Sequence, residues 1–382
     1  MKIVVFTSFF TPAFLGGGPI RTLAAMVRGA PPTFDTAVVT GNTDLGCSEP
    51  MNVIGERWVE HEGSRVFYCN ARSWTSLFRG MCAVRSWQPD VVYVNSFFDA
   101  RYSILPQFLF MAKFFLPNIF VIAPRGEFST GALSIKGTKK RAYIFVFRSL
   151  RLHKRVLWHA STANEEHDIR AAVGVSARIL VREDDTLLPS AAAPPKTRPE
   201  PGILRAVSLS RISPMKGVLT LLEGLQRVGE PVLLDIIGPA EDVDYSEQCH
   251  AAAAAAPANV RINFLGAKDP NEVRGTLAAY DVLLSPTRGE NFGHVIAEAL
   301  SVSCPVLCAD VTPWTQVLTA GGGDVVTENT AAGWARAVES YARLSDTERF
   351  ERRLAAGKAY EQWKSNSSDP HFFTLLQKHI SP

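Results

Sequence analysis

Short apolar stretches separated by longer stretches of mixed polarity form the main pattern of this chain. In the first half they are rich in β-branched and aromatic residues and cover residues 3–6, 36–39, 91–94, 119–123, 156–159 and 178–181. In the second half similar stretches cover residues 204–208, 232–237, 260–265, 282–285 and 305–308. Unbroken apolar strands are typical of parallel sheets that helices cover on both faces. The pattern therefore predicts an α/β protein with two parallel sheets.

A proline-rich stretch divides the two halves. Residues 189–202 contain five prolines and no periodicity, which is typical of a linker. We therefore predict one doubly wound, Rossmann-like domain over residues 1–190 and a second over residues 203–362. In a chain of 382 residues each domain is large enough to bury its own core. Such sheets bind ligands outside the carboxyl ends of their strands, so we expect both domains to face a shared crevice.

Composition favours a globular protein of the cytoplasm. Apolar residues make up 46% of the chain and charged residues 20%, and the net charge of +3 gives no reason to expect nucleic acid as a partner. The first apolar stretch follows Met1-Lys2 directly, without the pattern of a signal peptide, and no apolar run reaches the ~20 residues that span a bilayer. The six cysteines form no CxxC pair, as expected for buried thiols in a reducing compartment.

Residues 285–298 carry the most informative chemistry. After an apolar strand comes a loop with Glu290, and then a helix that opens near Gly293 and carries Glu298 about two turns in. Helical side chains lean toward the N-terminus of their helix, so both carboxylates can point into one cleft. Free backbone N–H groups at the helix start suit a phosphate, and they belong to Phe292, Gly293, His294 and Val295. Carboxylates for hydroxyls beside amides for phosphate describe a nucleotide-sugar pocket.

This segment resembles the Glu-x7-Glu signature of retaining glycosyltransferases of family 4, which share the GT-B fold. The resemblance implies two Rossmann-like domains around a central cleft, with residues 363–382 supplying a helix that crosses back to the first domain. It also implies that Glu290 and Asn291 contact the hydroxyls of the donor sugar and that Glu298 contacts the ribose. No first-domain acid is a convincing nucleophile. The resemblance implies front-face attack instead, in which the leaving diphosphate takes the proton of the acceptor.

Two cations stand where the resemblance expects them. Arg211 and Lys216 follow the first strand of the second domain, in a stretch similar to the family motif Gly-Arg-Leu-x-x-x-Lys-Gly, although Ser210 replaces its glycine. In the family these cations bind the diphosphate, and fixed cations stabilise the charge that develops on the leaving oxygen. Because they neutralise the diphosphate and no DxD motif stands at a strand end, we expect neither a metal ion nor another cofactor.

Several backbone positions complete the expected donor site. A glycine-rich turn with Gly17 and Gly18 joins the first strand to a helix, where glycines let the backbone approach a phosphate. It resembles the N-terminal loop of family members that closes over donor and acceptor. Gly238 and Leu265 end the second and third strands of the second domain, where family members bind the nucleotide through backbone atoms. These contacts leave the identity of the base open.

Asn95, Arg125 and Glu127 follow first-domain strands, so we expect them on the acceptor side of the crevice. Many family members have a histidine near the position of Arg125, and it is missing here. We interpret Arg125 and Glu127 as contacts for acceptor or phosphate. The equal alternative is an Arg–Glu pair that braces a loop.

Residues 128–164 are strongly basic. They contain eight lysines and arginines and no acidic residue, and they enclose the apolar stretch 142–147. One interpretation is a surface that contacts an anionic membrane at the cytoplasmic face of the inner membrane. The other is a buried helix flanked by solvated cations.

The resemblance predicts transfer of a hexose-type sugar from a UDP- or GDP-sugar to a glycan or lipid-linked acceptor, in the synthesis of a bacterial surface polysaccharide. Two alternatives share the fold. A nucleotide-sugar epimerase needs additional acidic and histidine groups around the anomeric carbon, and the motif spacing fits it less well. A non-catalytic subunit that binds a sugar nucleotide is disfavoured by the intact set Arg211, Lys216, Glu290 and Glu298.

Overall fold

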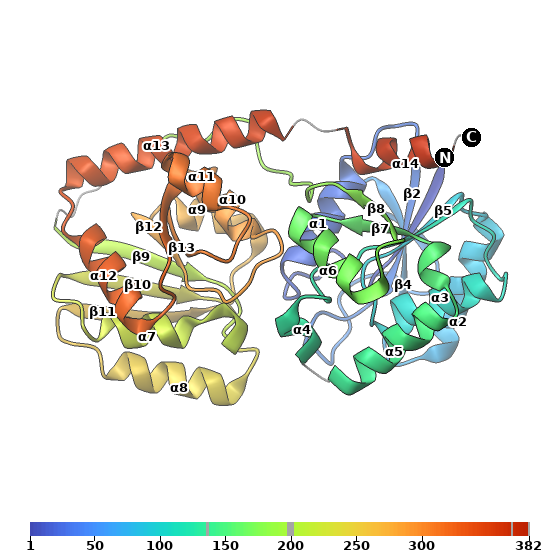
Figure 1. The fold of residues 1–382 in the computed structure, drawn as a ribbon, viewed down its shortest axis with the longest axis horizontal. Helices are drawn as coiled ribbons and strands as arrows, with labels where there is room; N and C mark the ends of the chain where they lie inside the picture. The colour runs from blue at the N-terminus through green and yellow to red at the C-terminus, as the bar shows by residue number, and fades with distance from the viewer. Residues whose placement is uncertain (135–136, 197–201, 368–369, 381–382) are drawn as a thin grey trace. The chain divides into compact units, whose positions relative to one another are not determined.

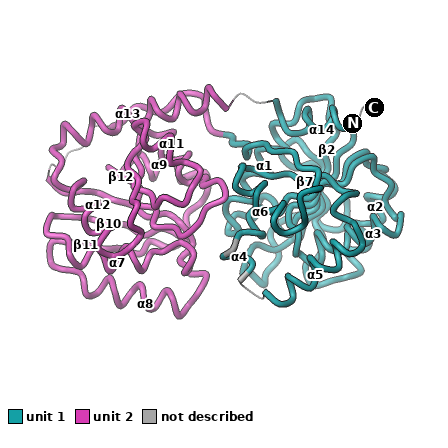
Figure 2. Tube along the Cα trace, in the orientation of Figure 1, with its two compact units in different colours: residues 1–187, 369–382 teal, residues 188–368 magenta. Residues whose placement is uncertain are grey.

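The computed structural model describes all residues except 135–136, 197–201, 368–369 and 381–382. The chain divides into two compact units, which Figure 2 distinguishes by colour. Unit 1 comprises residues 1–187 and 369–382, and unit 2 comprises residues 188–368. The stretch predicted as a linker therefore lies at the start of unit 2, with its residues 197–201 outside the described part. The C-terminal segment is divided, because helix α13 belongs to unit 2 and helix α14 to unit 1.

Unit 1 is built on one large sheet (Figure 1). Its eight strands are arranged in the order β3-β4-β2-β1-β5-β6-β7-β8, and only the β3–β4 pair is antiparallel. The strands are β1 (Lys2–Phe6), β2 (Asp35–Gly41), β3 (Trp58–His61), β4 (Ser64–Cys69), β5 (Val91–Val94), β6 (Ile119–Ile122), β7 (Leu157–Ala160) and β8 (Arg178–Val181). The helices are α1 (Gly18–Arg28), α2 (Trp74–Trp87), η1 (Ala100–Ile104), α3 (Leu105–Met111), α4 (Thr130–Ser134), α5 (Gly137–Ser149), η2 (Leu152–Lys154), α6 (Ala163–Val173) and α14 (Phe372–Ile380).

Helices cover both faces of this sheet, which explains its apolar strands. Successive side chains of a strand point to opposite faces, and β1 shows this with Val4 in one core cluster and Ile3 in the other. The Val4 cluster includes side chains of α2, α5 and α6. The Ile3 cluster includes side chains of α1 and three residues of α14, which are Phe372, Phe373 and Leu376. The last helix of the chain is therefore an integral part of the unit 1 core.

Unit 2 contains a fully parallel sheet of six strands in the order β11-β10-β9-β12-β13-β14 (Figure 1). The strands are β9 (Leu204–Leu209), β10 (Val232–Ile237), β11 (Val260–Gly266), β12 (Val282–Ser285), β13 (Val306–Ala309) and β14 (Gly323–Val326). The helices are η3 (Pro214–Lys216), α7 (Val218–Leu225), α8 (Val243–Ala254), α9 (Pro270–Leu277), α10 (His294–Leu300), α11 (Thr315–Val317), η4 (Leu318–Gly322), α12 (Ala331–Ala342) and α13 (Asp346–Asn366).

The same two-faced packing holds in unit 2. One core cluster joins the sheet to α7, α8 and α12 and contains the fully buried Trp334. The other joins it to α9, α10 and α13 and contains Phe292 and Trp314. All eleven strands predicted from apolar runs are present, and three further strands, β3, β4 and β14, had not been predicted. In the described part of the chain, no helix is both long enough and apolar enough to cross a membrane.

Candidate functional site

The loops after β9 and β12 meet at the centre of the unit 2 sheet. These two strands are hydrogen-bonded neighbours, and the strand order reverses between them, because β10 follows β9 on one side and β13 follows β12 on the other. Such a switch point is where open α/β sheets bind ligands. Lys216 from the first loop and Glu290 from the second form an ion pair with Nζ and Oε2 2.6 Å apart. Their side chains are 17% and 21% exposed, so both can still reach a ligand.

Backbone contacts hold these two loops together. The N–H of Arg288 donates to the Met215 carbonyl at 2.8 Å. Gly217 adopts a left-handed conformation with φ of 69°, and a Cβ on it would lie 2.1 Å from the Pro286 carbonyl oxygen. Only glycine allows this approach. The glycine of the Lys-Gly motif therefore lets the lysine loop lie against the loop that carries Glu290.

Asn329 braces the second loop, and the sequence analysis did not identify it. Its amide nitrogen donates to the carbonyls of Pro286 and Thr287 at 3.4 and 3.1 Å. Its amide oxygen accepts a 2.8 Å hydrogen bond from Nε1 of Trp334, a fully buried residue of α12. Asn329 follows β14, a strand that the apolar pattern had missed, so no signal pointed to it.

Arg211 has a carboxylate partner of its own. Its guanidinium forms an ion pair with Glu241, which lies in the loop after β10, and the two side chains are 35% and 39% exposed. The two loops are close because the N–H of Ile212 donates to the Pro239 carbonyl at 2.9 Å. The sequence identified Arg211 and Lys216 as cations for the diphosphate but named no protein partner for either. The structure pairs each of them with a different glutamate.

Gly238 makes this approach possible. A Cβ there would lie 1.9 Å from the carbonyl oxygen of Ser210, and φ is 147°. Glycine is required at position 238 because the loop after β9 lies against it. A direct contact of Gly238 with a donor stays a prediction.

The helix that carries Glu298 opens where the sequence predicted. Gly293 is its N-cap with φ of 88°, and α10 begins at His294. Glu298 is therefore only the fifth helical residue, little more than one turn in rather than two, and it is 8% exposed. Asn291, His294 and Val295 are half-buried around the cap.

Phe292 belongs to the core rather than to the surface of the site. Its side chain is 2% exposed and packs on the ring of Trp314, with centroids 5.6 Å apart. The carbonyl of Phe292 accepts a hydrogen bond from Nε1 of Trp314. The aromatic residue next to Gly293 therefore anchors the start of α10 to the core. Trp314 is a second supporting residue that the sequence analysis did not identify.

Leu265 lies in a β-bulge at the end of β11. The strand pairing passes from Ile236 and Phe264 to Ile237 and Gly266, which leaves Leu265 outside the ladder. The residue is 55% exposed. Bulges of this kind re-aim the chain at the end of a strand and leave one residue unpaired. This conformation is compatible with the predicted backbone contact.

In unit 1 the glycine-rich turn adopts a defined conformation. Gly17 is the N-cap of α1 with φ of 71°, no described atom would lie within 4 Å of a Cβ on it, and Gly18 is the first helical residue. The preceding loop is held by Asp44, whose carboxylate accepts hydrogen bonds from the N–H groups of Phe14 and Leu15 at 2.8 and 3.1 Å. The turn therefore presents backbone rather than side chains.

The structure brings Asn95 and Arg125 together. Nε of Arg125 donates to Oδ1 of Asn95 at 2.7 Å, and a second nitrogen donates to the Tyr93 hydroxyl at 2.8 Å. Arg125 also forms an ion pair with Asp184, and both side chains are almost fully buried at 6% and 5% exposure. Buried charges are stable only when they are paired in this way. Arg125 therefore belongs to an internal network, and Asp184 is the partner that sequence reasoning missed.

Glu127 lies apart from that network. Its carboxylate accepts hydrogen bonds from the Ser96 hydroxyl at 2.7 Å and from the N–H of Phe97 at 2.6 Å, so it orders the turn after β5. Burial raises its pKa against the opposing effect of these hydrogen bonds. The alternative of an Arg125–Glu127 pair is wrong, because each residue has a different partner. Contact of either residue with an acceptor stays a prediction.

Across the described residues, no group of three or more histidine, cysteine, aspartate or glutamate side chains is arranged to hold a metal ion. The candidate site comprises two ion pairs, a helix N-terminus and strand-end backbone.

Comparison with known proteins relates these loops to a family. Residues 193–363 match the model of the family described as glycosyl transferases group 1. A stretch of 149 residues is 33% identical to the phosphatidyl-myo-inositol mannosyltransferase of Mycobacterium leprae and covers 38% of this chain and 38% of that protein.

Solved structures show the same fold over nearly the whole chain. HepE of Anabaena, in complex with UDP and glucose, has a TM-score of 0.72 at 17% identity and covers 99% of this chain and 98% of its own. Sucrose-phosphate synthase of Thermosynechococcus elongatus has a TM-score of 0.65 at 15% identity, with 99% of each chain covered. The predicted GT-B fold is confirmed.

Proposed function

We propose that this chain, whose residues 193–363 match the model of glycosyl transferases group 1, is a retaining glycosyltransferase of family 4, as the sequence resemblance predicts. In this proposal it moves a hexose from a nucleotide-diphosphate donor to a hydroxyl of a glycan or lipid-linked acceptor. The ion pair of Lys216 and Glu290 at the switch point of the unit 2 sheet is the observation that carries the proposal. It puts a cation suited to the diphosphate within 2.6 Å of a carboxylate suited to sugar hydroxyls.

The two ion pairs suggest how the donor is held. The donor's diphosphate takes over Arg211 and Lys216 from Glu241 and Glu290. Glu290 is thereby free to accept hydrogen bonds from the sugar hydroxyls, together with Asn291. Exchange of a carboxylate for a diphosphate keeps each cation neutralised in a half-buried site. The backbone of Phe292, Gly293, His294 and Val295 lies beside the phosphates.

The nucleoside occupies the other side of the same loops. Glu298 accepts hydrogen bonds from the ribose hydroxyls, and the strand ends at Gly238 and Leu265 border the base. UDP in the HepE complex supports a uridine nucleotide as the first donor to test. The glycine-rich turn with Gly17 and Gly18 contributes backbone contacts from unit 1.

Chemistry follows from alignment and charge rather than from a protein base. The acceptor oxygen attacks the anomeric carbon on the face from which the diphosphate leaves. The bond from that carbon to the leaving oxygen breaks, its electron pair departs with the diphosphate, and a diphosphate oxygen takes the acceptor's proton. Lys216 and Arg211 stabilise the charge that develops, without a metal ion or another cofactor.

Two observations support an acceptor at a membrane. The mycobacterial relative is a phosphatidyl-myo-inositol mannosyltransferase, which supports a lipid-linked acceptor. The basic segment 128–164 supports peripheral binding to the cytoplasmic face of the inner membrane, where bacterial surface polysaccharides such as O-antigen are assembled. Asn95, Arg125 and Glu127 shape the acceptor side through the turn and the network that they order.

The test compares Lys216→Ala with Lys268→Ala, an exposed cation of unit 2 whose surface ion pair contributes little to stability. A panel of UDP-, GDP- and dTDP-sugars first identifies the donor by its stabilisation of the native protein against heat. Donor hydrolysis without acceptor is then measured. Loss of one stabilising charge should lower the rate of Lys216→Ala about 10²–10³-fold, with an unchanged melting temperature and a normal Lys268→Ala control. A near-normal rate for Lys216→Ala refutes the proposal, and an isomerised sugar in the NMR spectrum points to an epimerase instead.

A further inference from the structure

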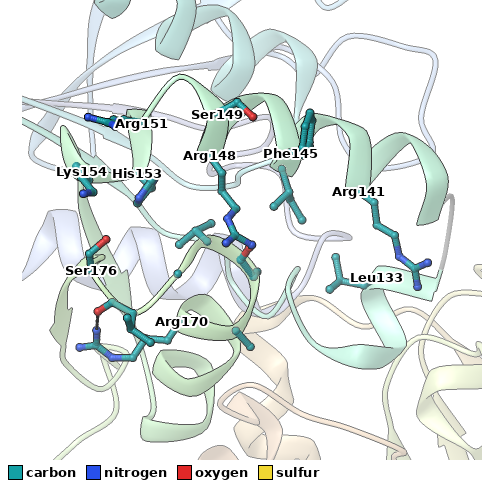
Figure 3. A pocket seen from close by; sticks show the side chains of 16 residues that line it. Leu133, Arg141, Phe145, Arg148, Ser149, Arg151, His153, Lys154, Arg170 and Ser176 are labelled. Carbon is teal, nitrogen blue, oxygen red and sulfur yellow. Dashed lines mark hydrogen bonds between the residues drawn. The ribbon is translucent and has the colours of Figure 1, made fainter.

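A wide groove lies in unit 1 between α5 and the end of α6 (Figure 3). It has a volume of about 1050 Å³ and is open on one side. Arg141, Phe145 and Arg148 line it from α5, His153 and Lys154 from η2, and Val175 from the segment after α6. None of these residues belongs to the proposed donor site.

The groove is strongly basic, and its charges are not neutralised. In the described part of the chain, Arg141, Arg148 and Lys154 form no ion pair with a carboxylate, and neither does the adjacent Arg151. Arg170 is the exception, because Glu166 neutralises it at 2.7 Å. Arg141 and Arg148 are seven residues apart and leave the same side of α5, as Figure 3 shows. Two guanidinium groups therefore face one side of the groove without a counter-charge.

His153, which also lines the groove, is buried close to these cations. The residue is 7% exposed, and among the described residues its Nδ1 atom has no hydrogen-bond partner. Burial lowers the pKa of His153, and the charges of Lys154 and Arg148 lower it further. A buried ring nitrogen without a partner is costly unless a ligand or solvent satisfies it. His153 thus lines the groove with its ring, while its Nδ1 atom is itself buried.

Large apolar side chains stand beside these cations and are exposed. Phe145 is 71% exposed and Val175 is 84% exposed, and both line the groove. Val146 in α5 and Leu150 directly after it are also exposed, at 50% and 56%. A soluble anion needs the cations but gains nothing from these side chains. A lipid with an anionic headgroup uses both, because its phosphate meets the arginines while its acyl chains cover the apolar groups.

We propose that the groove between α5 and α6 binds the phosphate headgroup of an anionic phospholipid and seats unit 1 on the bilayer surface. Arg141 and Arg148 contact the phosphate, and Phe145 and Val175 enter the interfacial region of the membrane. The proposal rests on the peripheral location given above but on none of the donor chemistry.

The test is flotation of the full-length protein with vesicles of phosphatidylcholine alone or mixed with phosphatidylglycerol. Each cation at such a surface contributes about 1 kcal/mol, which corresponds to about a fivefold change in partition. The double variant Arg141→Ala/Arg148→Ala should therefore bind mixed vesicles about 25-fold more weakly. Phe145→Ser should lower binding about tenfold or more, since it removes the phenyl group that the membrane would bury. Raised salt should weaken the wild type.

A matched control removes two cations at the opposite edge of the same sheet. Arg57 precedes β3 and Arg72 follows β4, both are exposed, and these strands are farthest from β7 and β8. Arg57→Ala/Arg72→Ala should bind vesicles like the wild type. Thermal stabilisation by the donor should be unchanged in all variants, which separates failure of this site from failure of the proposed function.

Three outcomes overturn the proposal. The first is equal binding to both kinds of vesicle, and the second is an equal loss of binding in the control variant. The third is release of the wild type from mixed vesicles by dilute inorganic phosphate or glycerol phosphate at constant ionic strength, which identifies the groove as a site for a soluble phosphate compound.

Discussion

Asn329 holds the loop after β12, which carries Glu290, through hydrogen bonds to two carbonyls of that loop. Replacing Asn329 tests whether the position of this loop controls turnover. Replacement by alanine removes the donors to the carbonyls of Pro286 and Thr287 and the acceptor for Nε1 of Trp334. Because Trp334 is fully buried, its N–H is left without a partner, which costs about 1–3 kcal/mol of folding free energy. In a domain of the size of unit 2, each kcal/mol lost lowers the melting temperature by roughly 2–4 °C.

The effect on turnover should be larger than the effect on stability suggests. Glu290 lies three residues beyond Thr287, and Lys216 is bound to it, so release of this loop displaces both proposed donor contacts. A displacement of about 1 Å can cost about 10²-fold in rate. We therefore expect kcat/KM of Asn329→Ala to fall roughly 10–100-fold, mainly through kcat. Asn329→Asp keeps the acceptor for Trp334 but turns an oxygen toward the carbonyls of Pro286 and Thr287 in place of the donor, so it should also lose activity.

Val338→Ala is the matched control. Val338 lies in α12 with Trp334, is fully buried, and its truncation leaves a cavity that costs a similar 1–3 kcal/mol or so. Valine has no hydrogen-bonding side chain, so its truncation breaks no hydrogen bond to either loop. The variant should retain near-normal kcat/KM. Urea unfolding and steady-state kinetics are measured for all three variants. Equal activity losses in Val338→Ala and Asn329→Ala refute the reasoning, and so does an Asn329→Ala variant that is destabilised but fully active.

Three further predictions concern other parts of the fold. Gly238→Ala should lower the free energy of unfolding by about 3 kcal/mol, since the new Cβ meets the Ser210 carbonyl. The control Gly63→Ala, with φ of 79° and open space around it, should lower it by only about 1–2 kcal/mol. Equal losses in urea unfolding contradict the contact. Glu298→Gln should weaken nucleotide binding about 10–100-fold by calorimetry, as expected when a hydrogen bond to a charged group is lost; unchanged affinity removes Glu298 from the ribose site. Burial and then the charge of Arg125 lower the pKa of His159 to about 3. The neutral ring therefore contributes its full share of stability above pH ~6.5. That share falls by about 1.4 kcal/mol at pH 5.5 and continues to fall toward pH 3, so a His159→Gln variant should lack this part of the acid slope, and an unchanged slope disproves the assignment.

The strands were predictable because both faces of each sheet are buried. A strand such as β5 has four buried residues in a row, three of them valine, and short buried runs of β-branched residues are typical of strands in such sheets. Of the three missed strands, β4 has this signature in its last four residues, whereas the edge strands β3 and β14 lack it. β3 is half-exposed and contains Glu60, and β14 contains Gly323 and an exposed aspartate. Such edge strands gain their structure from pairing with a neighbour rather than from their own composition.

The partners of the charged residues were not predictable. Arg125 pairs with Asp184 across 59 positions and Arg211 pairs with Glu241 across 30, and in both cases the sequence around the acid has no motif. Sequence reasoning could identify the cations from their chemistry. It could not decide whether each one had a partner within the protein, because that depends on which loops the sheet brings together.

The order of strands explains which contacts of the site could be inferred. β9 and β12 lie next to each other although Lys216 and Glu290 are 74 positions apart, and loops that follow the carboxyl ends of adjacent parallel strands must meet. Asn329 follows β14, which two strands of the sheet separate from β9, so strand adjacency does not bring it to the site. It arrives through the start of α12, where the buried Trp334 fixes its amide. The adjacent strands β9 and β12 thus bring Lys216 and Glu290 together. Asn329, at the start of α12, fixes the loop that carries Glu290. This is why Asn329 is expected to control turnover without contacting the donor.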